Sequence, residues 1–361
     1  MSFDALRPFG WHPFFAAAFA AEAEAVPGAV PGRVLTEHPG LYRVQSPQGE
    51  LLCEITGRLR HAALSREDLP AVGDWVLLQP ADASQARIAA VLPRRSAFVR
   101  RQGLQPQVVA ANLDTLLLVS ALNQELNLRR IERYLALAWE SGARPVIVLN
   151  KADLLPDAER AAVLAAIDSI ALGTDVVMLS ASTGEGLEQL DPWLQPGQTL
   201  ALLGSSGVGK STLVNALGVS RQQHTQAARS DDDRGRHTTT HRELFVLPGG
   251  ALLIDTPGMR ELALWQAGEG LDQGFAEIEA LLGHCRYRNC RHETEAGCAL
   301  QTAVAEGTLD PGRLQSWFKL QREAQWFERK VDPVLQANTK KRWKKITQLQ
   351  RRRYAAEAQA D

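Results

Sequence analysis

The sequence lacks a long apolar run: none reaches the roughly 18 residues that a membrane-spanning helix requires. The N-terminal stretch "PFFAAAFAAEAEA" is short, has no basic flank and contains Glu22 and Glu24, so it predicts a helix and not a signal peptide. Its composition, 45% hydrophobic and 22% charged, is typical of a soluble globular protein. With no export signal, we expect a cytoplasmic protein with no membrane partner.

Cysteine is also scarce, with four in 361 residues, and a few clustered thiols in a cytosolic chain indicate a metal site before disulfides. Cys53 stands alone in a strand pattern and is predicted to be an ordinary core residue. The other three lie in the polar loop "HCRYRNCRHETEAGCAL", where a closed set of three thiolates and one imidazole predicts one structural zinc ion per chain. His284 is the competing imidazole. The predicted ligands, spaced C-x4-C-x-H-x5-C, are Cys285, Cys290, His292 and Cys298.

Three patterns of periodicity divide the chain. Short apolar pieces separated by turn signals, from about 32 to 100, predict about five strands of a small β-barrel of OB type. Buried-strand runs alternating with helical spacing, from about 110 to 260, predict an α/β layer with a parallel sheet. The chain from 272 onward is mainly helical in pattern. The predicted division is an N-terminal helix or extension 1–30, an OB-type barrel 31–105, a GTPase domain 106–270 and a zinc-binding helical domain with a basic tail 271–361.

The stretch "LLGSSGVGKSTLVNALG" matches the phosphate-binding loop G-x-x-x-x-G-K-[ST], set between an apolar strand and a helix. Glycines let backbone N–H groups converge on the phosphates, and the helix N-terminus adds its positive end. Lys210 is expected to reach the β- and γ-phosphate oxygens and to assist catalysis, and Ser211 to hold Mg²⁺. The predicted phosphate-binding residues are Gly204, Ser205, Ser206, Gly207, Val208, Gly209, Lys210, Ser211 and Thr212.

A second phosphate element, "LLIDTPG", follows about 45 residues later in the pattern of a P-loop NTPase. Asp255 ends a strand and is expected to bind the magnesium ion through water. Gly258 is expected to donate its backbone N–H to the γ-phosphate. Together with the phosphate-binding loop, this predicts Mg²⁺ bound with the nucleotide.

Two further strand ends carry the elements that choose the base. In "VIVLNKAD", Asn150, Lys151 and Asp153 form N-K-x-D, and a carboxylate there suits the paired N–H donors of guanine. In "MLSAS", Ser180 and Ala181 place a backbone N–H where it meets guanine O6. All four motifs stand at the carboxyl ends of predicted strands, which is where open α/β sheets bind ligands. The sequence therefore predicts a site for GTP and GDP.

The order of the motifs is unusual, because the base-reading elements precede the phosphate-binding loop. A circular permutation explains this order, since chain ends lie at the surface and a cut elsewhere leaves the core intact. One consequence is that "DTPG" leads directly into the C-terminal region. We therefore expect nucleotide state to influence that region.

The chain also lacks the glutamine that often follows D-x-x-G in GTPases, because Met259 occupies that position. Slow hydrolysis in isolation is expected. In the loop "RSDDDRGRHTTTHREL", His237 is the candidate for positioning water. Thr239 is the candidate for a switch threonine that closes over Mg²⁺, with Thr238 and Thr240 as alternatives. The asparagine that holds K⁺ in some phosphate-binding loops is replaced by Gly207, so strong K⁺ dependence is not expected.

Positive charge is concentrated near the C-terminus. Between Arg313 and Arg353 the chain has 13 Lys/Arg residues and three acidic ones, while its net charge is −1. Cations that flank Trp343 and precede Tyr354 can neutralise phosphates while the aromatic rings stack on bases. A solvated charged helix is the alternative, but the barrel at the other end favours RNA.

In their order, "NKAD", "SAS", "GSSGVGKST", "GRHTTT", "DTPG" and the cysteine spacing resemble the RsgA (YjeQ) family, the circularly permuted GTPases of bacterial small-ribosomal-subunit biogenesis. The resemblance spans about residues 32 to 330. It implies an N-terminal OB-fold, a permuted GTPase domain and a zinc-binding helical domain. It also implies binding to the 30S subunit and its 16S rRNA, stimulation of GTP hydrolysis by that subunit, and a catalytic role for His237. The active form is expected to be a monomer.

Two other functions fit part of the pattern. An RNA-binding assembly factor could use its GTP site only as a regulatory switch, and the missing glutamine favours this alternative. The intact phosphate and magnesium set opposes it. A metabolic P-loop kinase fits less well, because it has no use for N-K-x-D.

Overall fold

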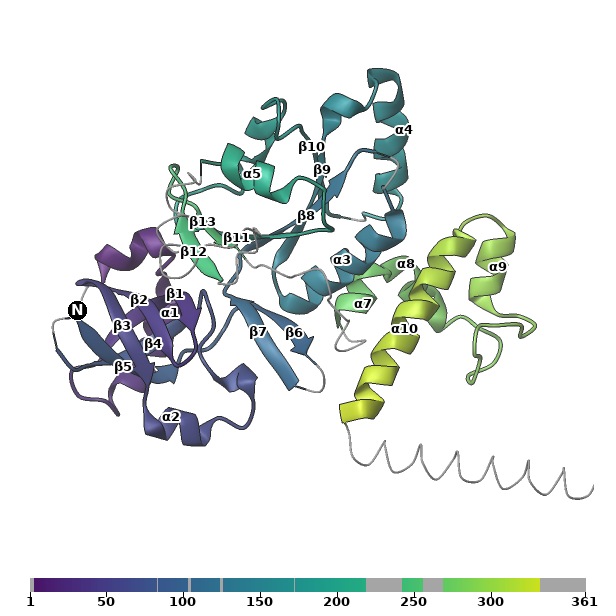
Figure 1. Cartoon of the computed structure of the whole chain (residues 1–361). Coiled ribbons are helices and arrows are strands. Elements are labelled where there is room, and N and C mark those ends of the chain that lie inside the picture. Colours follow the sequence, from purple (N-terminus) through teal and green to yellow (C-terminus); the bar gives the residue numbers. More distant parts are fainter. Residues whose placement is uncertain are drawn as a thin grey trace, which may run out of the picture. The chain divides into compact units, whose positions relative to one another are not determined.

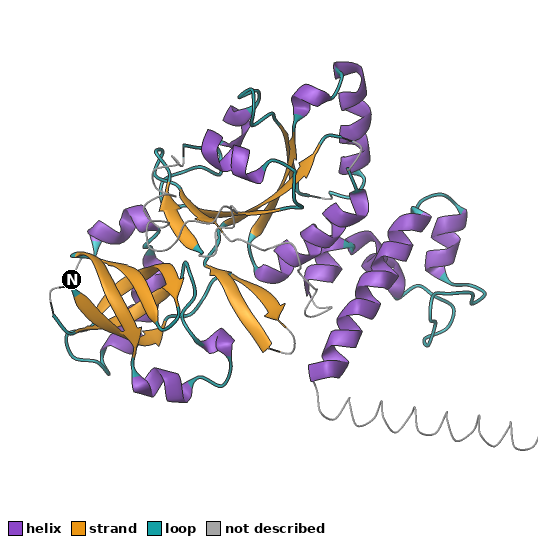
Figure 2. Cartoon of the chain, viewed as in Figure 1, coloured by secondary structure: helices purple, strands orange, loops and turns teal. Residues whose placement is uncertain are grey.

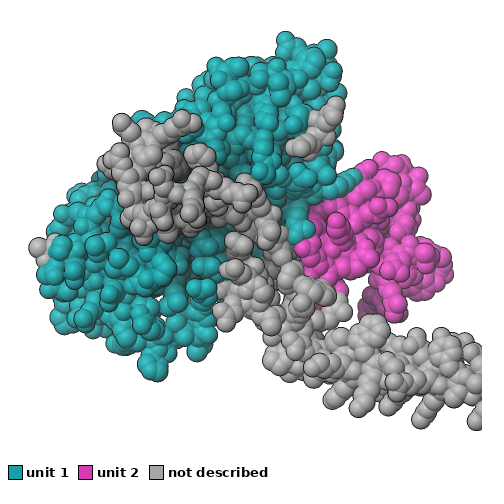
Figure 3. Space-filling view, in the orientation of Figure 1, with its two compact units in different colours: residues 1–262 teal, residues 263–361 magenta. Residues whose placement is uncertain are grey.

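The structure is a computed structural model, and it describes residues 3–82, 84–102, 105–123, 126–171, 173–218, 242–255 and 269–331. The chain divides into two compact units, residues 1–262 and 263–361 (Figure 3). Helices and strands are labelled in Figure 1 and coloured by type in Figure 2. No helix in the described parts of the chain is long and apolar enough to cross a membrane.

The first unit begins with the short helix η1 (Asp4–Phe9) and the predicted N-terminal helix, α1 (Pro13–Ala23). His12 caps α1, because its Nδ1 accepts a hydrogen bond from the backbone N–H of Phe14 at 3.2 Å. Aromatic and aliphatic side chains of this segment pack on one face of the following barrel, which explains why it is ordered. The buried members of this cluster are Leu6, Phe15, Phe19, Trp75, Leu77 and Leu92.

Five strands form the predicted OB-type barrel. Strand β1 pairs with both β2 and β4, β2 with β3, β3 with β5 in parallel, and β5 with β4, so the hydrogen-bonded ring is closed. Cys53 is fully buried among apolar side chains inside this ring, which confirms its prediction as a core residue. The barrel elements are β1 (Val30–His38), β2 (Leu41–Ser46), β3 (Gly49–Ile55), α2 (Gly57–Ala62), η2 (Arg66–Asp68), β4 (Trp75–Pro80) and β5 (Gln85–Val91).

A separate hairpin, β6 (Ala97–Gln102) and β7 (Gln105–Ala111), connects the barrel to the α/β layer. In that layer the strand order is β10-β9-β8-β11-β13-β12, and all neighbours are parallel except β12 with β13. Every residue of β8 is buried, as expected for a strand covered on both faces. The strands are β8 (Thr115–Ala121), β9 (Arg144–Asn150), β10 (Asp175–Met178), β11 (Thr199–Leu203), β12 (Glu243–Val246) and β13 (Leu252–Asp255).

Helices connect these strands (Figure 1). The predicted helix after β8 is present as α3, where Asn127 caps the start and Gly142, with φ of 78°, ends it. Strand β12 also pairs with β1 at Glu243 and Thr36, so the barrel and the α/β layer share one continuous sheet. The helices of this layer are α3 (Leu128–Ser141), η3 (Ala152–Leu154), α4 (Asp157–Asp168), η4 (Leu187–Leu190) and α5 (Lys210–Ala216).

Within residues 269–331 the second unit is mainly helical, as predicted, with its longest loop between α8 and α9. Buried Arg313 joins two parts of it, because its guanidinium donates to the carbonyl of Gly274 at 2.9 Å and to the Glu277 carboxylate. The guanidinium also lies over the ring of Phe275, 4.7 Å from its centroid. The helices are α7 (Glu269–Gly274), α8 (Ala276–Leu282), α9 (Ala299–Ala305) and α10 (Pro311–Val331).

Candidate nucleotide site and metal centre

The phosphate-binding loop joins β11 to α5 at the carboxyl edge of the parallel sheet. Gly207 and Gly209 have φ of 81° and 93°, in the left-handed region that glycine tolerates. A Cβ on Gly204 would lie 2.3 Å from the carbonyl oxygen of Val119 in β8, so the loop starts in close contact with the neighbouring strand. The glycines of the motif are therefore required by backbone shape and by close packing.

Lys210 stands at the start of α5 and reaches back across the loop. Its Nζ donates to the carbonyl oxygens of Gly204 and Ser205, both at 2.6 Å. The ammonium is thus held against the loop on which phosphates are predicted to lie. The next residue, Ser211, is exposed.

One buried amide connects three of the predicted elements. Asn150, at the end of β9, is 2% exposed. Its Nδ2 donates to the carbonyl oxygen of Val208 in the phosphate-binding loop at 2.9 Å. Its Oδ1 accepts from the backbone N–H of Lys151 at 2.8 Å and of Ala181 at 3.0 Å. A Cβ on Gly209 would lie 2.3 Å from Asn150 Nδ2, so the loop glycine also makes room for this amide.

The carboxylate predicted to choose guanine is exposed and oriented by a neighbouring loop. Asp153 Oδ1 accepts a hydrogen bond from Ser180 Oγ at 2.5 Å. Asp153 is exposed at the strand edge, whereas Ser180 is fully buried. The carboxylate can therefore meet a ligand while its orientation is fixed from behind.

The two backbone N–H groups after β10 both have protein acceptors. That of Ser180 donates to the carbonyl of Glu185 at 2.8 Å, and that of Ala181 donates to Asn150 Oδ1 at 3.0 Å. Both groups therefore order the loop in this structure, and their contact with guanine O6 stays a prediction. Lys151 has φ of 64°, and its Cε lies 3.9 Å from an ideal Cβ position on Gly209, so its stem runs beside the phosphate-binding loop.

Asp255, predicted to bind magnesium through water, ends β13, whose neighbour β11 leads into the phosphate-binding loop. It is half-buried, and the strand end holds it at the same edge as the other motifs. The remaining predicted residues of the switch segments, Thr239, His237 and Gly258, lie outside the described residues, as does Met259.

Sequence reasoning missed two side chains that hold the phosphate-binding loop from α3. Arg130 Nη1 donates to Ser205 Oγ at 2.9 Å, and Tyr134 Oη lies 3.3 Å from the same oxygen. The two residues are four apart and share a helix face. Their spacing after a strand end was a usable signal, but helical periodicity alone does not say which loop such a face meets.

The cysteine loop brings its four predicted ligands together. Their ligand atoms all lie within 4.8 Å of one another, and the group includes His292. His284 is exposed and lies outside that group. The cysteines are free thiols, so no disulfide competes for them.

The distances in this cluster suit a tetrahedral ion. His292 Nδ1 lies 3.4 Å from Cys285 Sγ and 3.6 Å from Cys298 Sγ. Zinc bonds of about 2.3 Å to sulfur and 2.0–2.1 Å to nitrogen place such atoms about 3.6 Å apart in a tetrahedron. Desolvation, followed by the nearby thiols of Cys298 and Cys285, raises the pKa of Cys290 to about 11. A cation between these sulfurs would reverse that effect, so the residues fit zinc as the resident metal.

Comparisons with known proteins show the family of the chain. A protein of Opitutus terrae named small ribosomal subunit biogenesis GTPase RsgA is 50% identical over 361 aligned residues, covering 96% of this chain and 97% of the relative. The chain belongs to the RsgA family. The family model described as RsgA GTPase matches residues 91–265. An RsgA of Streptomyces coelicolor is 44% identical, covering 95% of this chain and 93% of its own.

Solved structures support the permuted fold. YjeQ from Thermotoga maritima is similar with a TM-score of 0.63 at 28% identity, covering 82% of this chain and 98% of that one. YloQ, described as a circularly permuted GTPase, is similar in fold with a TM-score of 0.60 at 24% identity, covering 83% of this chain and 96% of that one. This RsgA-family chain is therefore a GTP-hydrolysing P-loop GTPase of ribosome biogenesis with a circularly permuted GTPase domain.

Proposed function

We propose that this chain binds the 30S ribosomal subunit late in its maturation and hydrolyses GTP to GDP and phosphate when that subunit stimulates it. The observation that carries the proposal is the hydrogen-bonded joint at Asn150, which holds the phosphate-binding loop and both base-reading loops in one site. Relatives named small ribosomal subunit biogenesis GTPases support the choice of subunit. Cytoplasmic location and action as a monomer are part of the proposal.

The proposal gives each residue of the nucleotide site a role. The loop from Gly204 to Thr212 surrounds the phosphates, with Lys210 supplying a charge-assisted bond and Ser211 a magnesium ligand. Asp153 chooses guanine, because its exposed carboxylate accepts from paired N–H donors. Asp255 supports the magnesium ion, and Gly258 the γ-phosphate. In the switch segment, Thr239 closes over magnesium and His237 positions the attacking water.

We divide the chain after the N-terminal extension into a barrel at 31–105, a GTPase domain at 106–270 and a zinc-binding domain at 271–361. The surfaces outside the nucleotide site are proposed to contact rRNA. The barrel, the cysteine loop and the basic tail bind the RNA backbone. In the cysteine loop, the side chains of Arg286, Arg288 and Arg291 are all exposed, as phosphate contacts require. Arg286 also lies over the ring of Tyr287 at 5.6 Å from its centroid, which pairs a cation with an exposed aromatic face. Zinc bound by the Cys3His cluster keeps this loop folded.

The test is GTP turnover by the purified full chain, alone and with 30S, 50S or 70S particles at a fixed salt concentration. We expect a slow basal rate that rises steeply with 30S only. Lys210→Ala should lose GTP binding, and Asp153→Asn should weaken the preference for guanine over other bases. Lys319→Ala, a change of the same kind in the second unit, should leave nucleotide binding unchanged.

A rate indifferent to every particle, with GTP still bound, would contradict the proposal. It would support an RNA-binding assembly factor in which GTP acts only as a regulatory switch. Unchanged GTP affinity and base selectivity in both site variants would instead overturn the residue assignments.

A further inference from the structure

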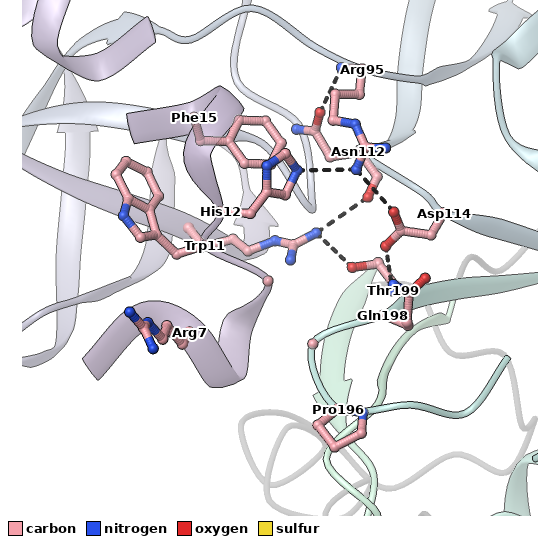
Figure 4. Close-up of a pocket in the computed structure, with 13 residues that line it drawn as sticks. Arg7, Trp11, His12, Phe15, Arg95, Asn112, Asp114, Pro196, Gln198 and Thr199 are labelled. Atoms are coloured by element: carbon pink, nitrogen blue, oxygen red, sulfur yellow. Dashed lines mark hydrogen bonds and ion pairs between the residues drawn. The ribbon is translucent and has the colours of Figure 1, made fainter. Parts of the chain in front are cut away.

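A second pocket lies at the opposite edge of the sheet from the nucleotide loops. It has a volume of about 180 Å³ and is lined by the N-terminal segment, the barrel and the α/β layer (Figure 4). Thr199 begins β11 and Asp114 precedes β8, so the pocket is at the amino ends of strands whose carboxyl ends carry nucleotide elements. None of the roles proposed above uses this pocket.

The deepest charge in its wall is Arg33 of β1, which is 1% exposed. Its guanidinium donates to Thr199 Oγ1 at 2.9 Å, to the carbonyl of Asn112 at 3.4 Å and to the carbonyl of Phe9. Its Nε is buried without a hydrogen-bond partner. Within the described ranges no carboxylate forms an ion pair with it. A buried cation whose hydrogen-bond acceptors are all neutral is costly even with the carboxylates of Asp114 and Asp74 nearby, which makes a negative ligand favourable.

The single carboxylate in the wall is already used by other groups. Asp114 Oδ1 accepts from Arg95 Nη1 at 3.1 Å, and Asp114 Oδ2 accepts from the backbone N–H of Thr199 at 2.9 Å. Arg95 Nη1 also lies 3.0 Å from His12 Nε2 (Figure 4). Arg7 also borders the pocket, but its guanidinium is paired with Asp4 at 2.8 Å, so the guanidinium groups of Arg33 and Arg95 face the one carboxylate of the wall and leave the lining positive.

The backbone of the N-terminal segment packs closely against these charges. A Cβ on Gly10 would lie 2.6 Å from Arg33 Nη1 and 2.8 Å from the carbonyl oxygen of Gly197. Gly10 has φ of 82°, so a larger residue there is excluded by conformation as well as by space. The N-terminal segment therefore closes on the guanidinium only because glycine stands at this position.

We propose that this pocket binds one small tetrahedral oxyanion of the phosphate class. Guanidinium groups present rigid, paired N–H donors that match phosphate oxygens. A volume of about 180 Å³ is below the roughly 300–1,000 Å³ of pockets for larger ligands, so a single phosphate group fits better than a nucleotide. The anion supplies the hydrogen-bonded negative partner that Arg33 lacks.

The experiment uses the full chain saturated with a non-hydrolysable GTP analogue and Mg²⁺, which fills the γ-phosphate position as well, so that added phosphate cannot enter the nucleotide site. Inorganic phosphate is titrated by calorimetry at constant ionic strength, with chloride as the reference. Two variants change the charge of the lining, Arg95→Gln and Gln198→Glu. Matched controls make the same changes at exposed positions outside the pocket, Arg87→Gln and Gln195→Glu.

We expect one phosphate per chain, with affinity at least about tenfold weaker in both pocket variants and within about twofold of the original in both controls. Gln198 is exposed, so its variant tests the pocket even if Arg95→Gln fails to fold. Absence of saturable binding, or equal weakening in pocket and control variants, would overturn the proposal. A parallel titration with an RNA dinucleotide distinguishes the source: binding of the diester alone would reject a free anion in favour of an RNA backbone contact.

Discussion

The nucleotide loops and the cysteine loop are both irregular chain held in a defined shape, but they are held by different means. At the nucleotide site, one buried amide joins segments as far as 58 residues apart, from Asn150 to Val208. In the cysteine loop, the carboxylate of Glu295 accepts from the backbone N–H of Arg291, Glu293 and Thr294, none more than four residues away. Long-range bonds require a folded sheet first, whereas local bonds do not.

The nucleotide loops are also anchored by a more deeply buried residue than most of the candidate ligands in the cysteine loop. Asn150 is 2% exposed and follows a strand with an apolar core on both sides. Among the four metal ligands only Cys298 is buried, and the other three are half-buried. The core therefore determines the shape of the nucleotide loops, whereas the cysteine loop would depend on an ion bound by its four candidate ligands. The two sites should fail independently when each is damaged.

The largest effect is expected from loss of the metal. Cys290→Ser or prolonged chelation should remove the ion and unfold the cysteine loop, because structural zinc supplies about 10–16 kcal/mol in small zinc-binding peptides. GDP affinity should be unchanged, since the nucleotide loops are held by the sheet. Metal content and GDP binding are measured on the same samples. His284→Ser is the control, because that exposed imidazole lies outside the ligand group. Loss of GDP binding together with the metal would show that the two sites do not fail independently.

Asn150→Ala should have the next largest effect. The substitution removes three hydrogen bonds and leaves buried groups of Val208 and Ala181 unpaired. With about 1–3 kcal/mol for each of these two unsatisfied buried groups, a loss of about 2–6 kcal/mol in the unfolding free energy of the first unit is expected. GDP affinity should fall while metal content stays constant. Asn215→Ala, an exposed position on α5, is the matched control. Stability equal to that of the control would show that the joint is dispensable.

These two regions also differ in how far the sequence predicted them. The spacing predicts all four candidate ligands, because the metal geometry is local and four donors within 14 residues leave little choice. It leaves His284 as a competing imidazole, and the structure groups His292, which has φ of 64°, with the thiols. Sequence patterns alone do not reveal such a backbone turn.

At the nucleotide site, the motifs predicted which residues gather but not how they are joined. The strand ends were predictable, because sequence patterns reveal buried apolar strands and helix caps such as Asn127 and Gly142. The contact of Arg130 and Tyr134 with Ser205 was not, since it depends on the rotation of α3 over the sheet. Arg33, a buried charge in a strand, was also missed, because sequence alone gives no reason to bury an arginine.

Tyr134→Phe tests the weaker support of the phosphate-binding loop. The variant loses one hydroxyl contact at 3.3 Å from Ser205 Oγ, while Arg130 remains at 2.9 Å. A change of about 0.5–1.5 kcal/mol in the unfolding free energy is expected for one hydrogen bond. The ring stays in place, so GTP affinity should change by less than about threefold, a difference below about 0.7 kcal/mol. Equilibrium unfolding and nucleotide titration are compared with Tyr287→Phe, an exposed tyrosine of the second unit. A loss as large as that of Asn150→Ala would mean that α3, and not the buried amide, holds the loop.

The smallest effect is expected at Glu295, the organiser of the cysteine loop, and it should depend on pH. Hydrogen bonds from the backbone N–H of Arg291 and its neighbours lower the pKa of this carboxyl in the folded loop. Its stabilising effect is therefore present above the unfolded value of about 4.3 and is lost as the pH falls through the lower, folded value. Asn150 does not titrate, so its loops should lack this dependence.

The measurement is amide hydrogen exchange of the peptide 285–298 in the original chain and in Glu295→Gln, corrected for the intrinsic rate at each pH. Protection from exchange should be greater in the original chain than in Glu295→Gln near neutral pH. The protection of the two proteins should become equal as the pH falls through the pKa of the Glu295 carboxyl. Protonation of the metal ligands is common to both proteins, so the difference between them isolates Glu295. Glu293→Gln, at an exposed position in the same loop, controls for the change of charge. The difference in protection between the original chain and Glu295→Gln could instead persist at low pH, or appear equally around residues 150–153. Either result would mean that the Glu295 carboxylate does not hold the cysteine loop. The cysteine loop would then not differ from the nucleotide loops in being held by local hydrogen bonds.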